Sequence, residues 1–407
     1  MKSFHILPLP AARFLARPLT LAALALGASA MQLDPPVLLP GDTAPVVAPG
    51  VQAAAAMARG GNQYLVVWED SRTDGTGSVS TGGWGPGPSD IFAMRLDAAG
   101  QPIDLVPIVV SMRPFNQTRT NVAWNGSNWL VVWESQRITQ YSTTRGIYAA
   151  RVSPSGAVLD DPPIVIDDTD DVDEYFPVVA SDGTNWAVLW DDYDRTTSLL
   201  TVNSAIVDPS GLVLQKRVLA SNSVGFMLPT NVRIAFAGGR YLMTSEHYRS
   251  GGFTWDIFGR LFDTGLNPLG PEFLIDGSGS DSVQSWVAGN GAGFYVTWST
   301  SGSWQYAYGT PVALDGTVAF PGGVELHSFG QVGSSPYVDW DGARWLVTYE
   351  GWSTSGSALF GVHVDTSGQP APEFTIVAPV SVAGALITKL LLLVLKVPAR
   401  LTAVVSP

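Results

Sequence analysis

One short phrase recurs through this chain and limits what the chain can fold into. Its clearest copy begins at Trp124, turns on Asn125 and Gly126, and continues as an alternating stretch over residues 129–134. Alternation between two faces is the pattern of a β-strand, and the glycine supplies the turn before it. Six copies occur, each with glycine at the same turn position: Gly61, Gly126, Gly183, Gly238, Gly291 and Gly342. The repetition predicts one structural unit used six times.

Each copy is surrounded by the same order of strand patterns. A short apolar strand a precedes the turn, the aromatic strand b follows it, and strands c and d flank a second turn. The second turn opens with Asp or Ser and closes with glycine, as type I turns do. These closing glycines stand 51 to 56 residues apart, at Gly100, Gly156, Gly211, Gly265, Gly316 and Gly368.

The size of the unit predicts the fold. Four antiparallel strands in about 50 residues make a propeller blade. Apolar side chains lie on both strand faces, so each unit must stack against its neighbours to bury them. We therefore predict an all-β chain that forms a six-bladed β-propeller of four-stranded antiparallel blades over residues 31–379. Two stacked β-sandwiches do not explain the constant strand order, and the rungs of a right-handed β-helix are shorter than this period.

The blade number is left open by the two ends of the predicted propeller. Residues 32–39 resemble strand d of the second unit, residues 159–166, which suits ring closure by an N-terminal strand. The sixth unit already has its own strand d at residues 373–377. Seven blades with one incomplete are the alternative.

The two termini differ from the repeats in composition. Residues 1–30 combine basic residues, an apolar run and small residues at Ala28 to Ala30, as a secretory signal peptide does. We expect a chain that is secreted, or held in the periplasm or at the cell surface. Residues 380–407 form an apolar tail with Lys389 near its centre. This tail is a marginal membrane helix, a segment packed on the propeller, or an end without a native role.

Charge and cysteine content limit the kinds of partner that we expect this chain to bind. The formal net charge is −13, and the chain has no cysteine, so disulfides and lipid-anchored cysteines are excluded. An acidic surface repels phosphate backbones, and we expect no nucleic-acid partner. We also expect no membrane partner, apart from the uncertain tail. We expect instead a monomer that binds a glycan or a protein at the cell surface.

The loops between strands b and c are the predicted functional face, because they vary in length and composition on a rigid scaffold. At this edge, strand b ends in a carboxylate in five units: Glu69, Glu134, Asp191, Glu246 and Glu350. Two such groups at glycosidase spacing are candidates for catalysis. The other interpretation is a repeated structural cap, and it is favoured because catalytic residues are usually singular whereas this residue repeats with the fold.

Further residues of this face are candidates for ligand binding. Tryptophan faces stack on sugar rings or cations, although the same residues could instead cover the blade tops. The candidates are Trp84, Trp255, Trp304, Trp352, Arg137, Asp192 and His247.

No cofactor is predicted, apart from weak candidates for calcium. The link between the second and third units carries the candidate ligands Asp168, Asp170, Asp171 and Asp173. Alternating carboxylates can collect calcium, but the link lacks the glycine and closing glutamate of an EF-hand loop. A solvated acidic link is the other interpretation. The histidines of the repeats fall in different units, which argues against an imidazole metal site.

The repeat, which residues 177–191 represent, resembles those of secreted bacterial β-propeller proteins, many of them without assigned activity. The resemblance covers residues 31–379 and implies the fold more than a function. Residues 181–186 share letters with the Asp-box of sialidases, but their spacing and position differ. Sialidase activity is therefore not implied, and no motif of a serine hydrolase, zinc protease or P-loop protein occurs.

These observations lead to a main hypothesis and two others. We expect a secreted, non-catalytic propeller that binds a glycan or protein through its b–c loop face. The alternative is a secreted glycan-active hydrolase or lyase that uses the carboxylates at the ends of strand b. A structural blade array within a larger surface assembly is the third hypothesis.

Overall fold

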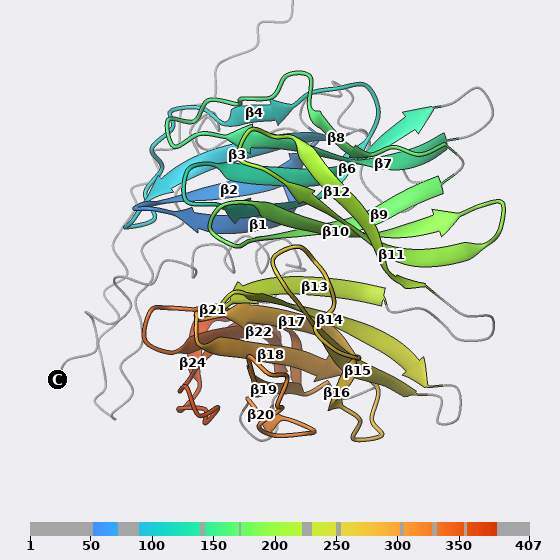
Figure 1. The fold of residues 1–407 in the computed structure, drawn as a ribbon. Coiled ribbons are helices and arrows are strands. Elements are labelled where there is room, and N and C mark those ends of the chain that lie inside the picture. Colours follow the sequence, from blue (N-terminus) through green and yellow to red (C-terminus); the bar gives the residue numbers. More distant parts are fainter. Residues whose placement is uncertain are drawn as a thin grey trace, which may run out of the picture. The chain divides into compact units, whose positions relative to one another are not determined.

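The computed structural model describes residues 52–71, 89–138, 143–170, 172–221, 230–249, 254–301, 305–327, 332–353 and 356–380. The chain divides into two units, Met1–Ala30 and Met31–Pro407, and every described residue belongs to the second. The described residues form 24 strands and no helix (Figure 1), so they include no helix able to cross a membrane. The expected signal peptide and the tail beyond residue 380 lie outside the described residues.

The strands form four-stranded antiparallel sets in which chain order is also spatial order. The first three sets are β1 (Gln52–Gly60), β2 (Gln63–Asp70), β3 (Asp90–Asp97) and β4 (Ile108–Ser111); β5 (Gln117–Trp124), β6 (Trp129–Ile138), β7 (Thr143–Val152) and β8 (Ile164–Asp167); and β9 (Val172–Ser181), β10 (Trp186–Asp194), β11 (Leu199–Val207) and β12 (Val213–Ser221).

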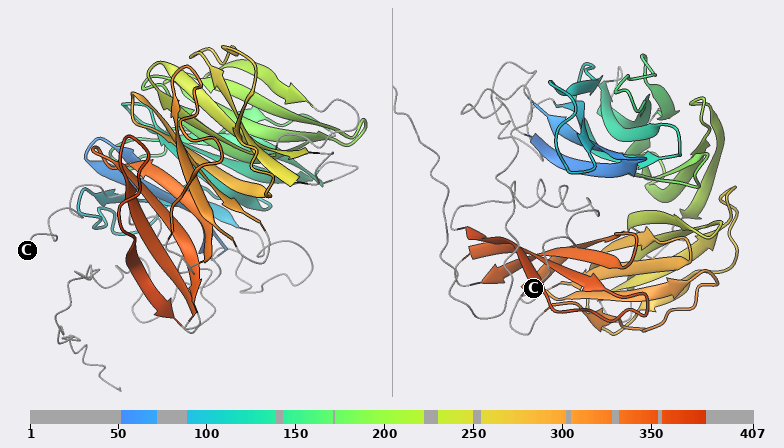
Figure 2. Two further views of the ribbon diagram at one scale, coloured as in Figure 1. Left: turned by 90° about the horizontal axis from the view of Figure 1, so that it is seen from below. Right: turned by 90° about the vertical axis from the view of Figure 1, so that its left-hand side faces the viewer.

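The C-terminal half repeats the same plan. Its sets are β13 (Thr230–Ala237), β14 (Arg240–Arg249), β15 (Thr254–Phe262) and β16 (Phe273–Asp276); β17 (Ser282–Gly289), β18 (Gly293–Thr300), β19 (Ala307–Ala313) and β20 (Val324–Glu325); and β21 (Val332–Trp340), β22 (Trp345–Ser353), β23 (Gly356–Val364) and β24 (Phe374–Val380). Figure 2 follows these sets in chain order, from blue to red.

Hydrogen bonding joins two of the sets. A parallel bridge between Arg145 on β7 and Asp173 on β9 merges the second and third sets into one eight-stranded sheet. The other four sets are separate four-stranded sheets. The predicted all-β chain of four-stranded antiparallel units is confirmed at this level.

The predicted glycine turns are present. All six glycines between strands a and b have positive φ, from 53° at Gly238 to 103° at Gly342, in the region that glycine enters without a Cβ clash. The second turn differs in one unit. Leu266 rather than Gly265 has positive φ there (55°), and its N–H donates to the carbonyl of Asp263. The prediction of Gly265 as the closing residue is wrong by one position. Leu266 is 1% exposed, and its packing in the core holds this backbone conformation.

The core lies between consecutive sets rather than inside any one of them. Trp129 of the second set donates its indole N–H to the carbonyl of Ala58 in the first, at 3.1 Å. Trp186 of the third set donates in the same way to Ala123 of the second, at 3.1 Å. Both rings are fully buried. A buried indole that finds a backbone acceptor contributes apolar area without leaving its N–H unpaired. The aromatic residue of strand b therefore holds one set against the preceding one.

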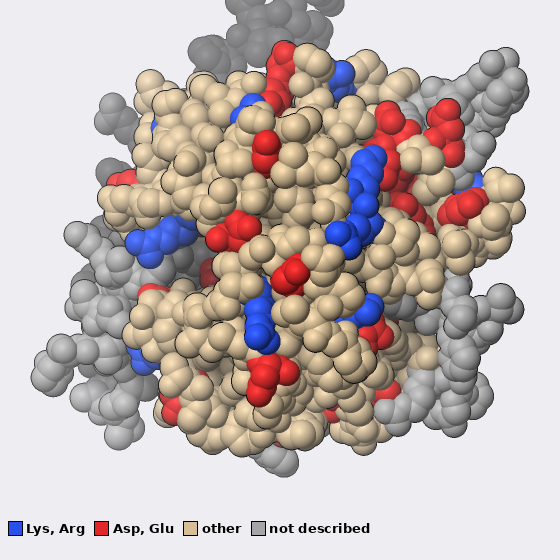
Figure 3. All heavy atoms as spheres, viewed as in Figure 1, with Lys and Arg blue, Asp and Glu red and all other residues tan. Residues whose placement is uncertain are grey.

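Charged side chains on the surface are sparse and mixed. On the face shown in Figure 3, positive and negative side chains lie interspersed among uncharged ones, in keeping with a charged fraction of 14%.

Candidate functional site

The carboxylates at the ends of strand b reach across to the next set. Glu69 accepts a hydrogen bond from the backbone N–H of Arg119. Glu134 accepts one from the N–H of Phe176 at 2.6 Å, and Glu246 accepts one from the N–H of Ser285 at 3.2 Å. Each of these carboxylates is buried. The repeated carboxylate thus joins the second strand of one set to the first strand of the next.

The first strands share an unusual backbone conformation at or next to the residues that donate these N–H groups. Arg119, Phe176, Asn231, Gln284 and Ser335 have positive φ between 50° and 57°. In β5, β13, β17 and β21 a shift of the strand register falls at this position, which marks a β-bulge. A bulge turns one backbone N–H out of the ladder, and that N–H is free to donate to the neighbouring set.

The fifth set uses a different group for the same purpose. Ser299 occupies the carboxylate position there, and its hydroxyl donates to Oε1 of Gln284 at 2.9 Å. That same oxygen accepts the backbone N–H of Ser335 in the next set at 3.2 Å. The glutamine side chain thus replaces the missing carboxylate. In the sixth set, Glu350 is half-buried and lies opposite Ser334 of β21.

Asp191 is the exception among these carboxylates. It occupies the same register as the others, opposite Tyr175 on β9, and it is 9% exposed. Its Oδ1 atom is buried and has no hydrogen-bond partner within the part of the chain that the structure describes. Burial raises the pKa of Asp191 to about 7, although the charge of Arg233 opposes the shift. The neighbouring carboxylates Asp192 and Glu134 raise this pKa further.

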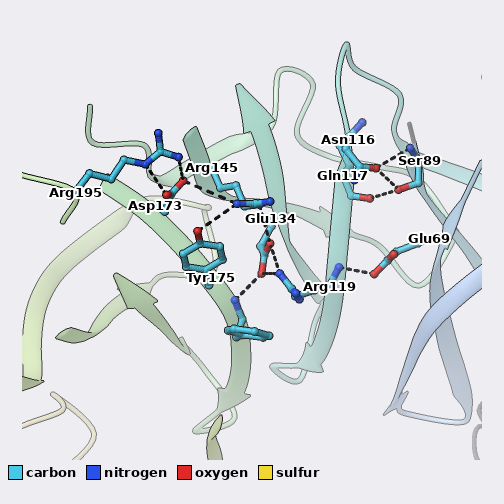
Figure 4. A network of polar contacts seen from close by, with 11 residues as sticks. Glu69, Ser89, Asn116, Gln117, Arg119, Glu134, Arg145, Asp173, Tyr175 and Arg195 are labelled. Carbon is cyan, nitrogen blue, oxygen red and sulfur yellow. Dashed lines mark hydrogen bonds and ion pairs between the residues drawn. The ribbon is translucent and has the colours of Figure 1, made fainter. Parts of the chain in front are cut away.

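Glu134 stands in a network of arginines (Figure 4). Nη1 of Arg119 lies 3.0 Å from one carboxylate oxygen of Glu134 and 3.1 Å from the other, and Nε of Arg145 lies 3.8 Å away. Burial nevertheless raises the pKa of Glu134, against the opposing effects of Arg119 and of the backbone N–H of Phe176. Asp173 binds Arg195 in the same network, with a 2.7 Å contact.

A cavity of 490 Å³ is lined by Arg119 and Phe176, which contact Glu134, whereas Glu134 and Asp191 themselves are not part of its wall. Its wall comes from the first strand of every set, with residues 55–57 of β1, 119–122 of β5, 176–179 of β9, 233–235 of β13, 286–289 of β17 and 337–339 of β21. Two arginines face aromatic rings in the wall. The guanidinium of Arg119 lies 4.1 Å from the ring centre of Phe176, and that of Arg233 lies 4.9 Å from the ring centre of Trp286. A cavity of this size suits a small ligand.

The candidates for ligand binding do not form one cluster among the described residues. Trp84 and Trp304 lie outside the described residues, and for Arg137 and Trp352 only the backbone is described. His247 and Trp255 lie on paired strands of the fourth set. The ring of His247 stacks on Phe258 at 4.4 Å, and burial lowers the pKa of this histidine. Trp255 packs edge-on against Tyr248 at 5.3 Å. Their role in binding stays a prediction.

Asp192 belongs to the third set and lies next to Asp191 in the strand. One carboxylate oxygen accepts a hydrogen bond from the side-chain amide of Asn203 at 2.5 Å, while Oδ1 is buried and has no partner among the described residues. Burial raises the pKa of Asp192 to about 7, and the charge of Asp167 adds to the shift.

The calcium candidates are divided among different surroundings. Asp173 is buried and paired with Arg195, whereas Asp168 is exposed and accepts a hydrogen bond from Tyr148 at 3.2 Å. Asp171 lies outside the described residues. Among the described residues, no group of three or more His, Cys, Asp or Glu side chains is placed to hold a metal ion. Calcium binding stays an untested prediction.

The cavity residues were not among the candidates from the sequence. The sequence directed attention to the variable loops, whereas the cavity is lined by first strands that look apolar and structural. One signal was present. Arg233 is a charged residue inside the otherwise apolar stretch of residues 232–237.

Comparison with known proteins supports the fold. No protein-family model matches the sequence, and no curated protein matches it. A protein of unknown function from Dyadobacter fermentans is similar in structure at a TM-score of 0.53 and 10% identity, over 82% of this chain and 96% of that one. An N10 neuraminidase-like protein of A/little yellow-shouldered bat/Guatemala gives 0.48 and 9%, over 74% and 92%. A GH32 β-fructofuranosidase from Bombyx mori gives 0.42 and 9%, over 82% and 88%.

The comparison corrects the main functional hypothesis. The similar solved structures include this fructofuranosidase and two arabinanases, which by their names act on glycans. The prediction of a non-catalytic binding protein is contradicted by this finding. That prediction treated every carboxylate of strand b as architecture, and Asp191 does not behave as the others do. At this level of identity the similarity establishes a β-propeller-like fold built from antiparallel sheets.

Proposed function

We propose that this chain is a secreted glycan-active hydrolase built on a six-bladed β-propeller, with Asp191 as its general acid. The blade number is supported by the six four-stranded sets and by the cavity wall, to which the first strand of each set contributes. The single observation that carries the catalytic role is the state of Asp191. It is a buried carboxyl group with a pKa of about 7 and one oxygen that no described residue bonds, at a position where equivalent carboxylates are held by a backbone N–H.

Glycoside hydrolysis needs an acid that is still protonated at neutral pH and a second carboxylate that is ionised. Asp191 has the pKa of such an acid. In the proposed step its proton moves to the glycosidic oxygen as the bond between that oxygen and the anomeric carbon breaks. Water attacks the anomeric carbon, and the proton of that water passes to the second carboxylate.

Glu134 is the second carboxylate that we propose. Its charge acts on Asp191. Burial raises the pKa of Glu134 itself, while Arg119 and the N–H of Phe176 oppose that shift by favouring the ionised form. Two carboxyl groups in unlike surroundings are the arrangement that separates an acid from a base. Glu69 and Glu246, each held by the next set, have structural roles in this proposal.

The test is hydrolysis of a panel of α- and β-linked glycans by the purified chain and by Asp191→Asn. Loss of a general acid lowers turnover by about 10²–10⁴-fold, and we expect an unchanged melting temperature. Asp208→Asn, which removes an exposed turn carboxylate, is the matched control and should keep full turnover. Because the acid form is required, wild-type turnover should also fall as the pH rises through about 7.

Two results would reject the proposal. The first is a wild-type chain that cleaves no glycosidic bond in the panel. The second is an Asp191→Asn variant that retains wild-type turnover.

A further inference from the structure

Arg233 carries a positive charge in the wall of the cavity, and no carboxylate of the described residues pairs with it. The residue lies on β13 opposite Thr244, and its guanidinium stacks over Trp286 at 4.9 Å. Nη1 donates to the carbonyl of Val232 at 2.8 Å. Among the described residues, Nε is buried without a hydrogen-bond partner, and the guanidinium forms no ion pair with a carboxylate.

Several other arginines of the chain are paired with a carboxylate. Arg95 lies 2.5 Å from Asp104, and Arg151 lies 2.8 Å from Asp160. Arg119 in the same cavity wall contacts both oxygens of Glu134. A partly buried guanidinium without such a partner loses hydration that nothing replaces, unless another group supplies negative charge. The charges of Glu246 and Asp191 reach Arg233 only from beyond contact distance.

We infer that Arg233 is the binding site for an oxyanion, and that the glycan taken by this cavity carries a carboxylate or sulfate group. Guanidinium has five N–H donors in a planar fork, and the structure uses one of those of Arg233. A carboxylate or sulfate matches that fork with two parallel hydrogen bonds. The inference rests on the proposed function for the sugar, whereas the oxyanion site follows from Arg233 alone.

The aromatic wall fits the remainder of such a ligand. The rings of Trp286 and Tyr337 lie 4.6 Å apart in the same wall. Aromatic faces of this kind stack on the apolar face of a sugar ring. Trp286 also holds the guanidinium by its stacking contact, so one ring orients the charged group and flanks the space beside it.

The test measures binding of glucuronate, glucose 6-sulfate and glucose to the purified chain by calorimetry. We expect both anionic sugars to bind about tenfold or more tightly than glucose, with the stronger of the two identifying the oxyanion. Arg233→Met should lose this preference. It should also melt at the same temperature or higher, because it removes a buried and unpaired charge.

Arg260→Met is the matched control. Arg260 also has an Nε without a partner among the described residues, one backbone acceptor at 3.0 Å and a neighbouring ring, but it does not line the cavity. Its replacement should leave the preference for anionic sugars intact. If Arg233→Met does not fold, Arg233→Lys should retain a weakened preference, because lysine keeps the charge without the planar fork.

The outcomes separate this inference from the proposed function. Equal affinity for glucuronate, glucose 6-sulfate and glucose, or an Arg233→Met variant with an intact preference, overturns the oxyanion site even if glycans are hydrolysed. A preference for anionic sugars that depends on Arg233, without any hydrolysis, leaves the oxyanion site standing and rejects the enzyme.

Discussion

Two groups of single residues occupy the left-handed backbone region for different reasons. The glycines of the hairpin turns enter it freely, since they have no Cβ. Arg119, Phe176 and Gln284 enter it within strands, where a side chain makes the conformation cost about 1–2 kcal/mol. In Arg119 and Phe176, the N–H that points out of the strand ladder donates to a buried carboxylate of the preceding set. This hydrogen bond offsets the cost of the conformation. The glycines could be predicted from the sequence. The bulges could not, because their residues share no side-chain chemistry.

The raised pKa of Asp192 predicts how stability depends on pH. The folded-state pKa of about 7 lies above the ordinary value of 3.8, so the folded chain holds this proton more tightly than the unfolded chain. The stabilisation is complete below about pH 4 and is lost as the pH rises through 7. Asp192→Asn should flatten the fall in unfolding free energy between pH 5 and 8 by up to about 1.4 kcal/mol per pH unit.

Urea unfolding at pH 5, 6, 7 and 8 measures this slope. Asp208→Asn is the control. Hydrogen bonds from Ser210 and Leu212 lower the pKa of Asp208, so its contribution changes only below pH 4. A wild-type chain and an Asp192→Asn variant with the same slope would contradict the prediction.

At the scale of strands and turns, the position of each strand decides which carboxylate meets which backbone N–H of the next set. In the first, second and fourth sets the carboxylate at the end of strand b reaches the bulge region of the following set, and a single side chain therefore joins two sets. Glu246 shows the bond in full. It accepts from the N–H of Ser285 at 3.2 Å and from the side-chain amide of Asn231 at 2.9 Å. The sequence identified the repeated carboxylate, but its partner is a backbone group about 40 residues away.

Removing this bond should destabilise the chain measurably. Glu246→Ala leaves two donors without an acceptor, and we expect a loss of about 1–3 kcal/mol in unfolding free energy. Ser299→Ala at the equivalent position of the fifth set should cost less, because Gln284 still accepts the N–H of Ser335. Chemical denaturation of both variants compares them. A smaller loss for Glu246→Ala than for Ser299→Ala would show that the carboxylate does not hold the two sets together.

The sheets of the whole second unit depend on one another for burial. Each core cluster but one combines side chains from two consecutive sets, and the exception lies within the first set. A sheet that has both faces covered only by its neighbours has little stability alone. The described strands should therefore unfold as one body rather than as separate domains.

Leu189 tests this cooperativity. It is fully buried between the third and fourth sets, and Leu189→Ala should lower the unfolding free energy by about 2–5 kcal/mol. Tryptophan fluorescence and far-UV circular dichroism should still report one coincident transition. Leu214, which is 54% exposed, supplies the control, since Leu214→Ala should change stability by less than about 0.5 kcal/mol. Two separated transitions in Leu189→Ala would show that the sets form independent domains.

The sequence by itself determined the repeating unit, its strand order and its glycine turns, because these depend on local backbone conformation and on the alternation of side chains along a strand. It also located the carboxylates at the ends of strand b. Only the tertiary structure decided which of them is different. Within the described part of the chain, Asp191 lacks a hydrogen-bond partner for Oδ1, and Arg233 lacks a carboxylate within contact distance. Both facts depend on what an adjacent sheet presents across the interface. Residues far apart in sequence form the surroundings of these two side chains, so the sequence of a single repeat cannot predict them.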